Sequence, residues 1–240
     1  MSIFSYNNKI FAYNNKIFKT NWKPNQISDM IFWSDANSRN IIKDSYNRVS
    51  YWKDNSGLMN HSAQSLNSKK PLLVENVKNG HPSLYFQSDK FLQMTLNINY
   101  FTIFSVISTT NNNYIYSYGD DDTGFYLNGD TNVLKVSNSG TTSTKNYTNN
   151  WLFGSWKILI HQYNGTNLSH KLIINKENIN LTNVSTDNPG ILSQNIFKLG
   201  SKDNYGISGY IPEFMIFNRS LELSEMFQIS DWLNDKYEIY

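Results

Sequence analysis

Apolar and polar residues alternate with a period of two along much of this chain. The runs are short, and clusters of Asn, Gly, Ser and Asp separate them. The clearest runs cover residues 83–86, 100–107, 114–118, 124–127, 133–136, 156–163, 170–175, 196–199 and 209–217. Many short strands of this kind are typical of an all-β antiparallel sandwich or jelly roll. Pro212 cannot donate a ladder hydrogen bond, so it predicts an edge position or a bulge in the last run.

One segment near the C-terminus has a helical period instead. Ser224 is a favourable N-cap residue, and Glu225 follows in the first turn, where the helix dipole favours a carboxylate. Four apolar residues then recur at three- and four-residue spacing: Met226, Ile229, Leu233 and Tyr237. This spacing predicts one C-terminal helix that packs on the sandwich.

The first eighteen residues contain a seven-residue unit twice, Ile-Phe-Ser-Tyr-Asn-Asn-Lys and then Ile-Phe-Ala-Tyr-Asn-Asn-Lys, followed by another Ile-Phe. Asn tolerates the left-handed backbone of two-residue hairpin turns, so residues 7–8 and 14–15 are expected to be turns. The resulting three-stranded meander aligns Phe4, Phe11 and Phe18 in one column. A second set shares the opposite face: Ile3, Ala12 and Ile17. Such a ribbon is not stable alone in water, so it needs a surface to lie on.

This N-terminal arm, residues 1–26, precedes the segment with the sandwich pattern, residues 27–240. The favoured interpretation is an anchor that docks on another protein. Its proposed contact residues are Ile3, Phe4, Ile10, Phe11, Ile17 and Phe18. The alternative is two extra edge strands on the same domain. No Pro- or Ser-rich linker interrupts residues 27–240, so we expect one large domain behind the arm.

Composition narrows the classes of function. A net charge of +2 with 17% charged residues is too balanced for a nucleic-acid-binding surface. The chain has no cysteine, which excludes disulfides and thiol chemistry. We expect no signal peptide, because no basic segment followed by an apolar run opens the chain. We also expect no membrane partner, because no apolar run approaches eighteen residues.

Several segments carry a family resemblance together. In order, they are residues 31–36 (IFWSDA), 49–57 (VSYWKDNSG), 60–64 (NHSAQ), 70–71 (KP), 79–86 (NGHPSLYF), 101–104 (FTIF), 156–159 (WKIL), 209–221 (GYIPEFMIFNRSL), 224–225 (SE) and 232–237 (WLNDKY). This order resembles the concanavalin A-like, laminin-G-like jelly-roll superfamily, in the form found in phage and bacterial surface proteins. The resemblance covers residues 29–239.

The resemblance implies structural roles for most matching residues. Trp33, Trp52 and Trp156 fall in its segments and are expected in the core. Trp52 and Asp54 are expected to form a turn that fixes the loop before the first long strand. Glu213 is expected to face a neighbouring side chain in the last strand.

Catalytic chemistry is not visible in the sequence. Retaining glycanases of this superfamily carry a Glu-x-Asp-x-Glu strand, with two carboxylates about 5–5.5 Å apart. The glutamates here are Glu75, Glu177, Glu213, Glu222, Glu225 and Glu238, and none has an aspartate at that spacing. We therefore expect no enzyme activity. His161 and His170 flank adjacent predicted strands and can meet there. We interpret them as a structural pair, because no carboxylate accompanies them in the sequence.

Two kinds of binding site are candidates. Three adjacent aspartates fill a predicted hairpin loop: Asp120, Asp121 and Asp122. A hard cation such as Ca²⁺ would relieve their repulsion, and the alternative is a solvated turn. No other cofactor is indicated. For glycans, exposed aromatic rings beside amides are the useful groups, and the loop candidates are Tyr147, Trp151, Asn204 and Tyr205. Plain packing is an equal alternative for Trp151.

These observations, with the resemblance, favour a structural protein of a phage virion. It would be made in the host cytoplasm and display a lectin-like domain on the capsid or tail. The arm would bind other virion proteins, and particle symmetry favours a homo-oligomer. Weak multivalent contacts with cell-surface polysaccharide are expected. One alternative is a secreted or surface adhesin of a bacterium. A glycan-active enzyme is the other, and the glutamate spacing opposes it.

Overall fold

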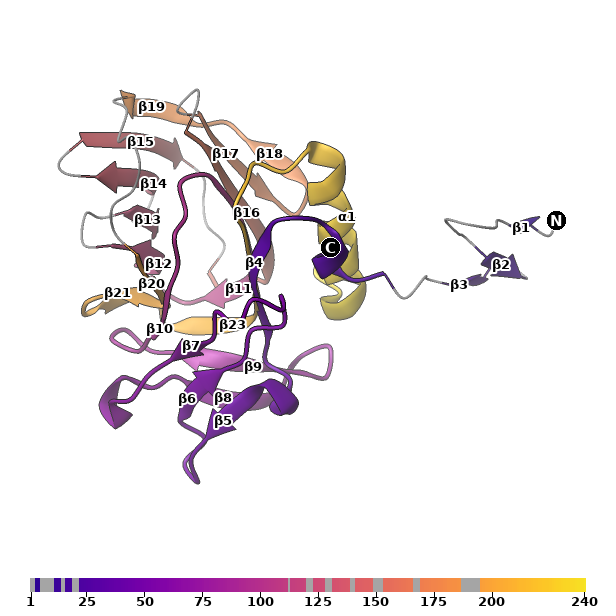
Figure 1. Cartoon of the computed structure of the whole chain (residues 1–240), viewed down its shortest axis with the longest axis horizontal. Coiled ribbons are helices and arrows are strands. Elements are labelled where there is room, and N and C mark those ends of the chain that lie inside the picture. The colour runs from indigo at the N-terminus through magenta and orange to yellow at the C-terminus, as the bar shows by residue number, and fades with distance from the viewer. Residues whose placement is uncertain are drawn as a thin grey trace.

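Strands make up most of the described chain, as the alternating runs predict. The computed structural model describes residues 3–4, 11–13, 16–18, 22–111, 113–119, 123–127, 131–138, 141–148, 153–165, 169–186 and 195–240. Within these ranges two large sheets pack face to face, and one C-terminal helix follows them (Figure 1). The predicted all-β sandwich with a C-terminal helix is therefore confirmed. Each of the alternating runs coincides with a strand to within two residues at either end.

The larger sheet has twelve strands in the described ranges, of which ten form one path. In spatial order the path is β19 (Thr182–Thr186), β15 (Thr141–Thr148), β14 (Thr131–Asn138), β13 (Thr123–Tyr126), β12 (Tyr114–Tyr118), β20 (Ile196–Leu199), β10 (Leu92–Thr95), β7 (Ser62–Ala63), β6 (Val49–Trp52) and β5 (Ile41–Lys43). The remaining two are β21 (Ser201–Lys202) and β22 (Tyr205–Gly206), beside β12. Neighbours pair antiparallel, except for a single parallel contact between β12 and β22.

The smaller sheet has eight strands in the described ranges. Its path is β18 (Glu177–Ile179), β17 (Ser169–Ile174), β16 (Lys157–Asn164), β11 (Phe101–Thr109), β23 (Gly209–Phe217), β9 (His81–Phe86) and β8 (Leu72–Lys78), with β4 (Met30–Asp35) paired to β23. Short 3-10 helices η1 (Pro24–Gln26), η2 (Ser38–Asn40) and η3 (Asn67–Lys69) lie in the connections.

The smaller sheet is covered on both faces. Its inner face packs on the larger sheet, and its outer face packs on α1 (Leu223–Tyr237), as Figure 1 shows. β11 shows the consequence, because all nine of its residues are buried. Phe101 and Ile103 enter the core between the sheets, whereas Phe104 and Val106 enter the core under the helix. A strand covered on both faces is apolar on both faces, which the alternating pattern alone does not distinguish.

The predicted helix is present, but it begins earlier than predicted. Glu222, not Ser224, is the N-cap residue. The Glu222 side chain accepts from the backbone of Glu225, and the Glu225 side chain accepts from the backbone N–H of Glu222. This reciprocal capping box satisfies two N–H groups that lack partners within the helix. The predicted apolar face is confirmed, since four residues are buried on it: Met226, Ile229, Leu233 and Tyr237.

Pro212 lies at a bulge, as predicted. The pairing of β11 with β23 shifts register between Val106 and Ser108, which leaves Pro212 outside the regular ladder. On the other side of β23, the Pro212 carbonyl accepts a hydrogen bond of 2.8 Å from the backbone N–H of Ala36. Pro212, which lacks an N–H, therefore lies at a position where the strand pairing requires no N–H donor.

The N-terminal repeat pairs in the predicted register. β1 (Ile3–Phe4), β2 (Phe11–Tyr13) and β3 (Lys16–Phe18) form a separate antiparallel sheet. Phe11 is the Cα partner of both Phe4 and Phe18, and Ala12 is the partner of both Ile3 and Ile17. Figure 1 shows this small sheet apart from the sandwich. Ile10 and the predicted turns at residues 7–8 and 14–15 lie outside the described residues.

Packing on the sandwich begins before residue 27. Pro24 of η1 is buried, and Trp22 packs against the core under α1. Ile27 and Met30 belong to the same core. Two residues that we assigned to the arm, Trp22 and Pro24, thus pack with the domain.

Candidate functional site

The predicted glycan residues do not gather into one site. Tyr147 is a correction, because it is 1% exposed in β15 rather than displayed on a loop. Its ring packs 6.2 Å from that of Phe125, and burial raises the pKa of its hydroxyl. The cause is the pairing of β15 between β14 and β19, which turns Ser143, Lys145 and Tyr147 inward. Trp151 lies outside the described residues.

Asn204 and Tyr205 are at the surface, as predicted. Tyr205 is 66% exposed. The Asn204 amide oxygen accepts a 2.9 Å hydrogen bond from Lys69 Nζ, which also pairs with Asp89 at 3.0 Å. Asn204 is thus partly occupied, whereas the Tyr205 ring remains available to a ligand.

Asp120, Asp121 and Asp122 lie outside the described residues, so the calcium prediction stays a prediction. Among the residues that the structure describes, no three His, Asp or Glu side chains gather as metal ligands do. The described helix α1 also falls short of the length and apolarity needed to cross a bilayer.

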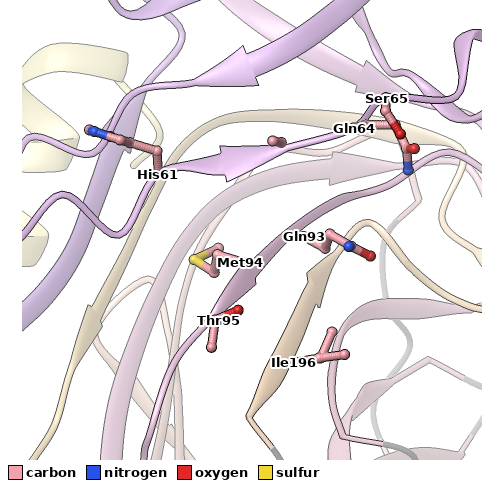
Figure 2. A pocket seen from close by; sticks show the side chains of 8 residues that line it. His61, Gln64, Ser65, Gln93, Met94, Thr95 and Ile196 are labelled. Atoms are coloured by element: carbon pink, nitrogen blue, oxygen red, sulfur yellow. The ribbon is translucent and has the colours of Figure 1, made fainter.

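A hollow of about 350 Å³ lies over β7, β10 and β20 of the larger sheet. Figure 2 shows His61 on one side, Gln64 and Ser65 on the other, and side chains of β10 between them. Its lining combines amides and hydroxyls with apolar groups and contains no Lys, Arg, Asp or Glu: His61, Ala63, Gln64, Ser65, Gln93, Met94, Thr95 and Ile196. Such a mixture is typical of a small-molecule site that binds uncharged polar groups.

Two of the lining side chains are held by the protein. His61 Nδ1 accepts a 3.0 Å hydrogen bond from the backbone N–H of Asp54, and the Tyr51 ring packs 5.0 Å from the imidazole. A neutral His61 therefore carries its proton on Nε2, as a donor. Gln64 accepts from the Leu66 N–H at 3.0 Å and is almost fully buried, so it shapes the hollow.

Sequence reasoning missed this hollow, although one signal was present. His61 and Gln64 stand in a segment that we took as a mark of the fold. Gln93 and Thr95 are exposed and alternate with buried residues of β10. Two exposed polar positions on one face of a central strand indicate where a sheet can bind a ligand. We did not recognise them because the alternating pattern at residues 92–95 is only four residues long.

His161 and His170 meet inside the sandwich, as we expected of adjacent strands. His161 Nε2 lies 3.1 Å from His170 Nδ1. The Tyr116 hydroxyl reaches His161 Nδ1, and His170 Nε2 lies 3.1 Å from Ser143 Oγ. Tyr116 and Ser143 belong to the larger sheet and both histidines to the smaller one, so this chain, the histidine bridge, joins the two sheets.

The histidine bridge is neutral. Burial, together with a smaller contribution from the Lys145 ammonium, lowers the pKa of His170 to about 3. Burial, followed by the repulsion of His170, also lowers the pKa of His161 well below its usual value. Donation in one direction, from Tyr116 through both rings to Ser143, satisfies every imidazole nitrogen with the two rings uncharged. Because both rings are buried, no substrate can reach them, which agrees with a structural pair.

Glu213 is the centre of a second buried network. Trp33 Nε1 donates to it at 2.7 Å, Lys236 Nζ at 2.7 Å and the Tyr237 hydroxyl at 2.8 Å. Lys236 also reaches Asp35 at 3.1 Å. Burial raises the pKa of the Glu213 carboxyl, and the Lys236 ammonium opposes that rise. The network ties β23 and β4 to α1. We expected one neighbouring side chain for Glu213, and the structure shows three that donate hydrogen bonds to it: Trp33, Lys236 and Tyr237.

The tryptophan and turn predictions hold. Trp33 and Trp52 are buried, and Trp156 packs at the edge of the core under α1. Asp54 accepts backbone hydrogen bonds from Trp33 at 2.9 Å, Ser56 at 2.8 Å and Asn60 at 3.0 Å. The carboxylate therefore fixes the loop after β6, and through it the position of His61 beside the hollow.

Comparison of the sequence with models of protein families and with curated proteins finds no match. The fold does match solved structures. The binding domain of paraclostridial mosquitocidal protein 1 superposes with a TM-score of 0.65 and 12% identity, over 88% of this chain and 53% of that one. The binding domain of botulinum neurotoxin DC, in complex with rat synaptotagmin II, gives 0.61 and 14%, over 88% and 52%.

Another match is the ligand-binding domain of botulinum neurotoxin serotype D in complex with N-acetylneuraminic acid. Its TM-score is 0.56 at 12% identity, over 85% of this chain and 51% of that one. At this identity the likeness establishes the fold, a β-sandwich that occurs in binding domains. The chain spans about half the length of the structures that it matches.

Proposed function

We propose that this chain is a glycan-binding module of a phage virion surface, held on the particle by its N-terminal arm. The observation that carries the binding role is the sandwich fold, which over 85–88% of the chain resembles binding domains, one of them in complex with synaptotagmin II and another with N-acetylneuraminic acid. The uncharged hollow on the larger sheet supports it further. Within the described residues, the buried position of the histidine bridge and of Glu213 also favours binding over catalysis.

The finer assignment is a concanavalin A-like, laminin-G-like jelly roll of the phage type. The order of the matched segments supports it, together with the location of Trp52 and Asp54. The arm supports the virion context. Its strands pair in the register that aligns three phenylalanines, and they pair with no described strand of the sandwich. In this proposal Ile3, Phe4, Ile10, Phe11, Ile17 and Phe18 bind a neighbouring virion protein. Symmetric copies then act together on host polysaccharide.

A second candidate is a bacterial surface or secreted adhesin. The favouring observation is that the structural matches are binding domains of bacterial toxins. The genomic neighbourhood separates the two contexts. A gene among capsid and tail genes supports the virion, and a gene remote from them overturns it.

Glycan-array binding by the full-length chain tests the binding role. We expect binding to a subset of glycans and no release of reducing sugar from them. Absence of binding on a broad array would refute a glycan-binding module, and sugar release would show an enzyme. Limited proteolysis of the isolated chain tests the arm. Cleavage before Trp22 with an intact sandwich supports an anchor that needs a partner, and full protection in a monomer opposes it.

Calcium binding at Asp120, Asp121 and Asp122 is a separate proposal. Isothermal titration with Ca²⁺ tests it directly, with the triple Asp→Asn variant as control. Heat that the control abolishes supports the site, and no heat with the unaltered chain removes it.

A further inference from the structure

We infer that the hollow over β7, β10 and β20 binds an uncharged sugar of one or two rings. The inference rests on the proposed glycan-binding function and names the site and the ligand class. It does not use the loop residues that the sequence suggested.

Size limits the ligand. The hollow holds about 350 Å³, at the small end of the ~300–1,000 Å³ typical of ligand pockets. A short saccharide or the end of a longer chain fits this size. It lies on the outer face of the sheet, because Gln93 and Thr95 are exposed while Leu92 and Met94 are buried on the same strand. A polymer can therefore reach it from solvent.

Free polar groups face the hollow. Within the described part of the chain, no hydrogen bond occupies the side chains of Gln93 or Thr95. An amide and a hydroxyl each donate and accept, which matches the mixed donor and acceptor character of sugar hydroxyls. His61 also lines the hollow, and its imidazole is held by the Asp54 backbone N–H and the Tyr51 ring.

Apolar groups complete the lining. Ala63 and Ile196 line the hollow between the polar side chains, and Ile196 is the cross-strand partner of Thr95. A sugar ring presents C–H groups on its faces and hydroxyls at its rim. The pairing of an aliphatic surface with amide and hydroxyl groups suits both parts.

Charge disfavours the anionic alternatives. No Lys or Arg lines the hollow. Lys198, the cross-strand partner of Gln93, is engaged by Asp203 at 3.2 Å. A carboxylate or phosphate would lose its hydration without a cation to replace it. A neutral saccharide is therefore favoured over a sialylated or phosphorylated one.

Titration of the full-length chain with methyl glycosides tests the inference. The neutral probes are the methyl glycosides of glucose, galactose, mannose and N-acetylglucosamine, and the anionic probe is that of N-acetylneuraminic acid. The variants are Gln93→Ala, Thr95→Val and their double. Thr182→Val, at an exposed position on β19, is the matched control, and thermal melting confirms that each variant is folded.

We expect at least one neutral probe to bind, with affinity reduced about two- to tenfold in each single variant and at least tenfold in the double. The control should bind as the unaltered chain does. Binding of the anionic probe alone would overturn the ligand class. Binding that the double variant leaves unchanged would overturn the site, while the glycan-binding function stands. No binding of any probe, together with a blank glycan array, would overturn both.

Discussion

Replacing His170 by glutamine should make the sandwich less sensitive to acid. In the folded chain His170 lies between His161 and Ser143, where it is about nine-tenths buried and neutral. Unfolding exposes the ring to water, where it titrates at its ordinary pKa of about 6.5. Glutamine preserves a donor and an acceptor at this position but carries no titrating proton.

The sign follows from the two pKa values. The folded-state pKa of His170 is about 3, so between pH 3 and the unfolded value near 6.5 the unfolded chain binds more protons. Acid therefore favours unfolding. The contribution is complete above about pH 6.5 and is lost as the pH falls toward 3. At pH 4.5, about two units below the unfolded pKa, the loss is roughly 3 kcal/mol, since each unit is worth about 1.4 kcal/mol. His161 acts in the same direction.

Urea unfolding at pH 7.5 and pH 4.5, followed by tryptophan fluorescence, measures the effect. The quantity to compare is the fall in unfolding free energy between the two pH values. We expect this fall to be about 3 kcal/mol smaller in His170→Gln than in the unaltered chain. The comparison cancels the titration of carboxyl groups common to both proteins.

Ser143→Ala is the control. It removes a hydrogen bond of the histidine bridge and leaves both histidines buried, so stability should fall by a similar amount at both pH values. An equal acid-dependent fall in His170→Gln and the unaltered chain would refute the reasoning. It would mean that His170 is already protonated in the folded chain or that the unfolded chain does not titrate it.

Three further substitutions test the packing. Gly200→Ala should lower the unfolding free energy by more than about 2 kcal/mol, because Gly200 has φ +99° and an added Cβ would overlap the Phe86 ring. An unchanged urea midpoint would contradict this. Glu213→Gln should cost roughly 3 kcal/mol in the same assay, since it removes a buried carboxylate from Lys236, and a neutral result would mean that the pair is dispensable. Glu225→Ala should cost about 1 kcal/mol, seen as a lower melting temperature, because the capping box is lost; no shift would show that the cap does not stabilise α1.

Strong alternation made most of the sandwich predictable, and its absence explains what was missed. β15 has the sequence Thr-Thr-Ser-Thr-Lys-Asn-Tyr-Thr, in which the inward positions are Ser143, Lys145 and Tyr147. Two of the three are polar, so no apolar period marks the strand. The segment therefore resembles a loop, and Tyr147 resembles an exposed ring. The core tolerates Ser143 because His170 bonds to it, and this partner comes from the other sheet.

The same limit applies to the candidate site. The sequence placed His161 and His170 on neighbouring strands, which the β16–β17 pairing confirms. The sequence did not predict that Tyr116 and Ser143 contact these histidines, because contacts between two sheets depend on how the sheets stack. The hollow is a similar case, since β7, β10 and β20 are far apart in the sequence and meet only when the larger sheet forms.

The structure also separates binding from stability, which makes both sets of experiments interpretable. Alternate side chains of a strand lie on opposite faces. On β10, Leu92 and Met94 are buried while Gln93 and Thr95 are exposed. The histidine bridge is buried between the sheets. Its strand β12 pairs with β20, which lines the hollow, but the hollow lies on the opposite, outer face of that sheet. Substitution of Gln93 or Thr95 should therefore leave the urea midpoint unchanged, and His170→Gln should leave sugar affinity at pH 7.5 unchanged. If a Gln93 variant lost both sugar binding and stability, the hollow would depend on the core beneath it. In that case alone, the loss of binding could not be assigned to a direct contact between Gln93 and the sugar.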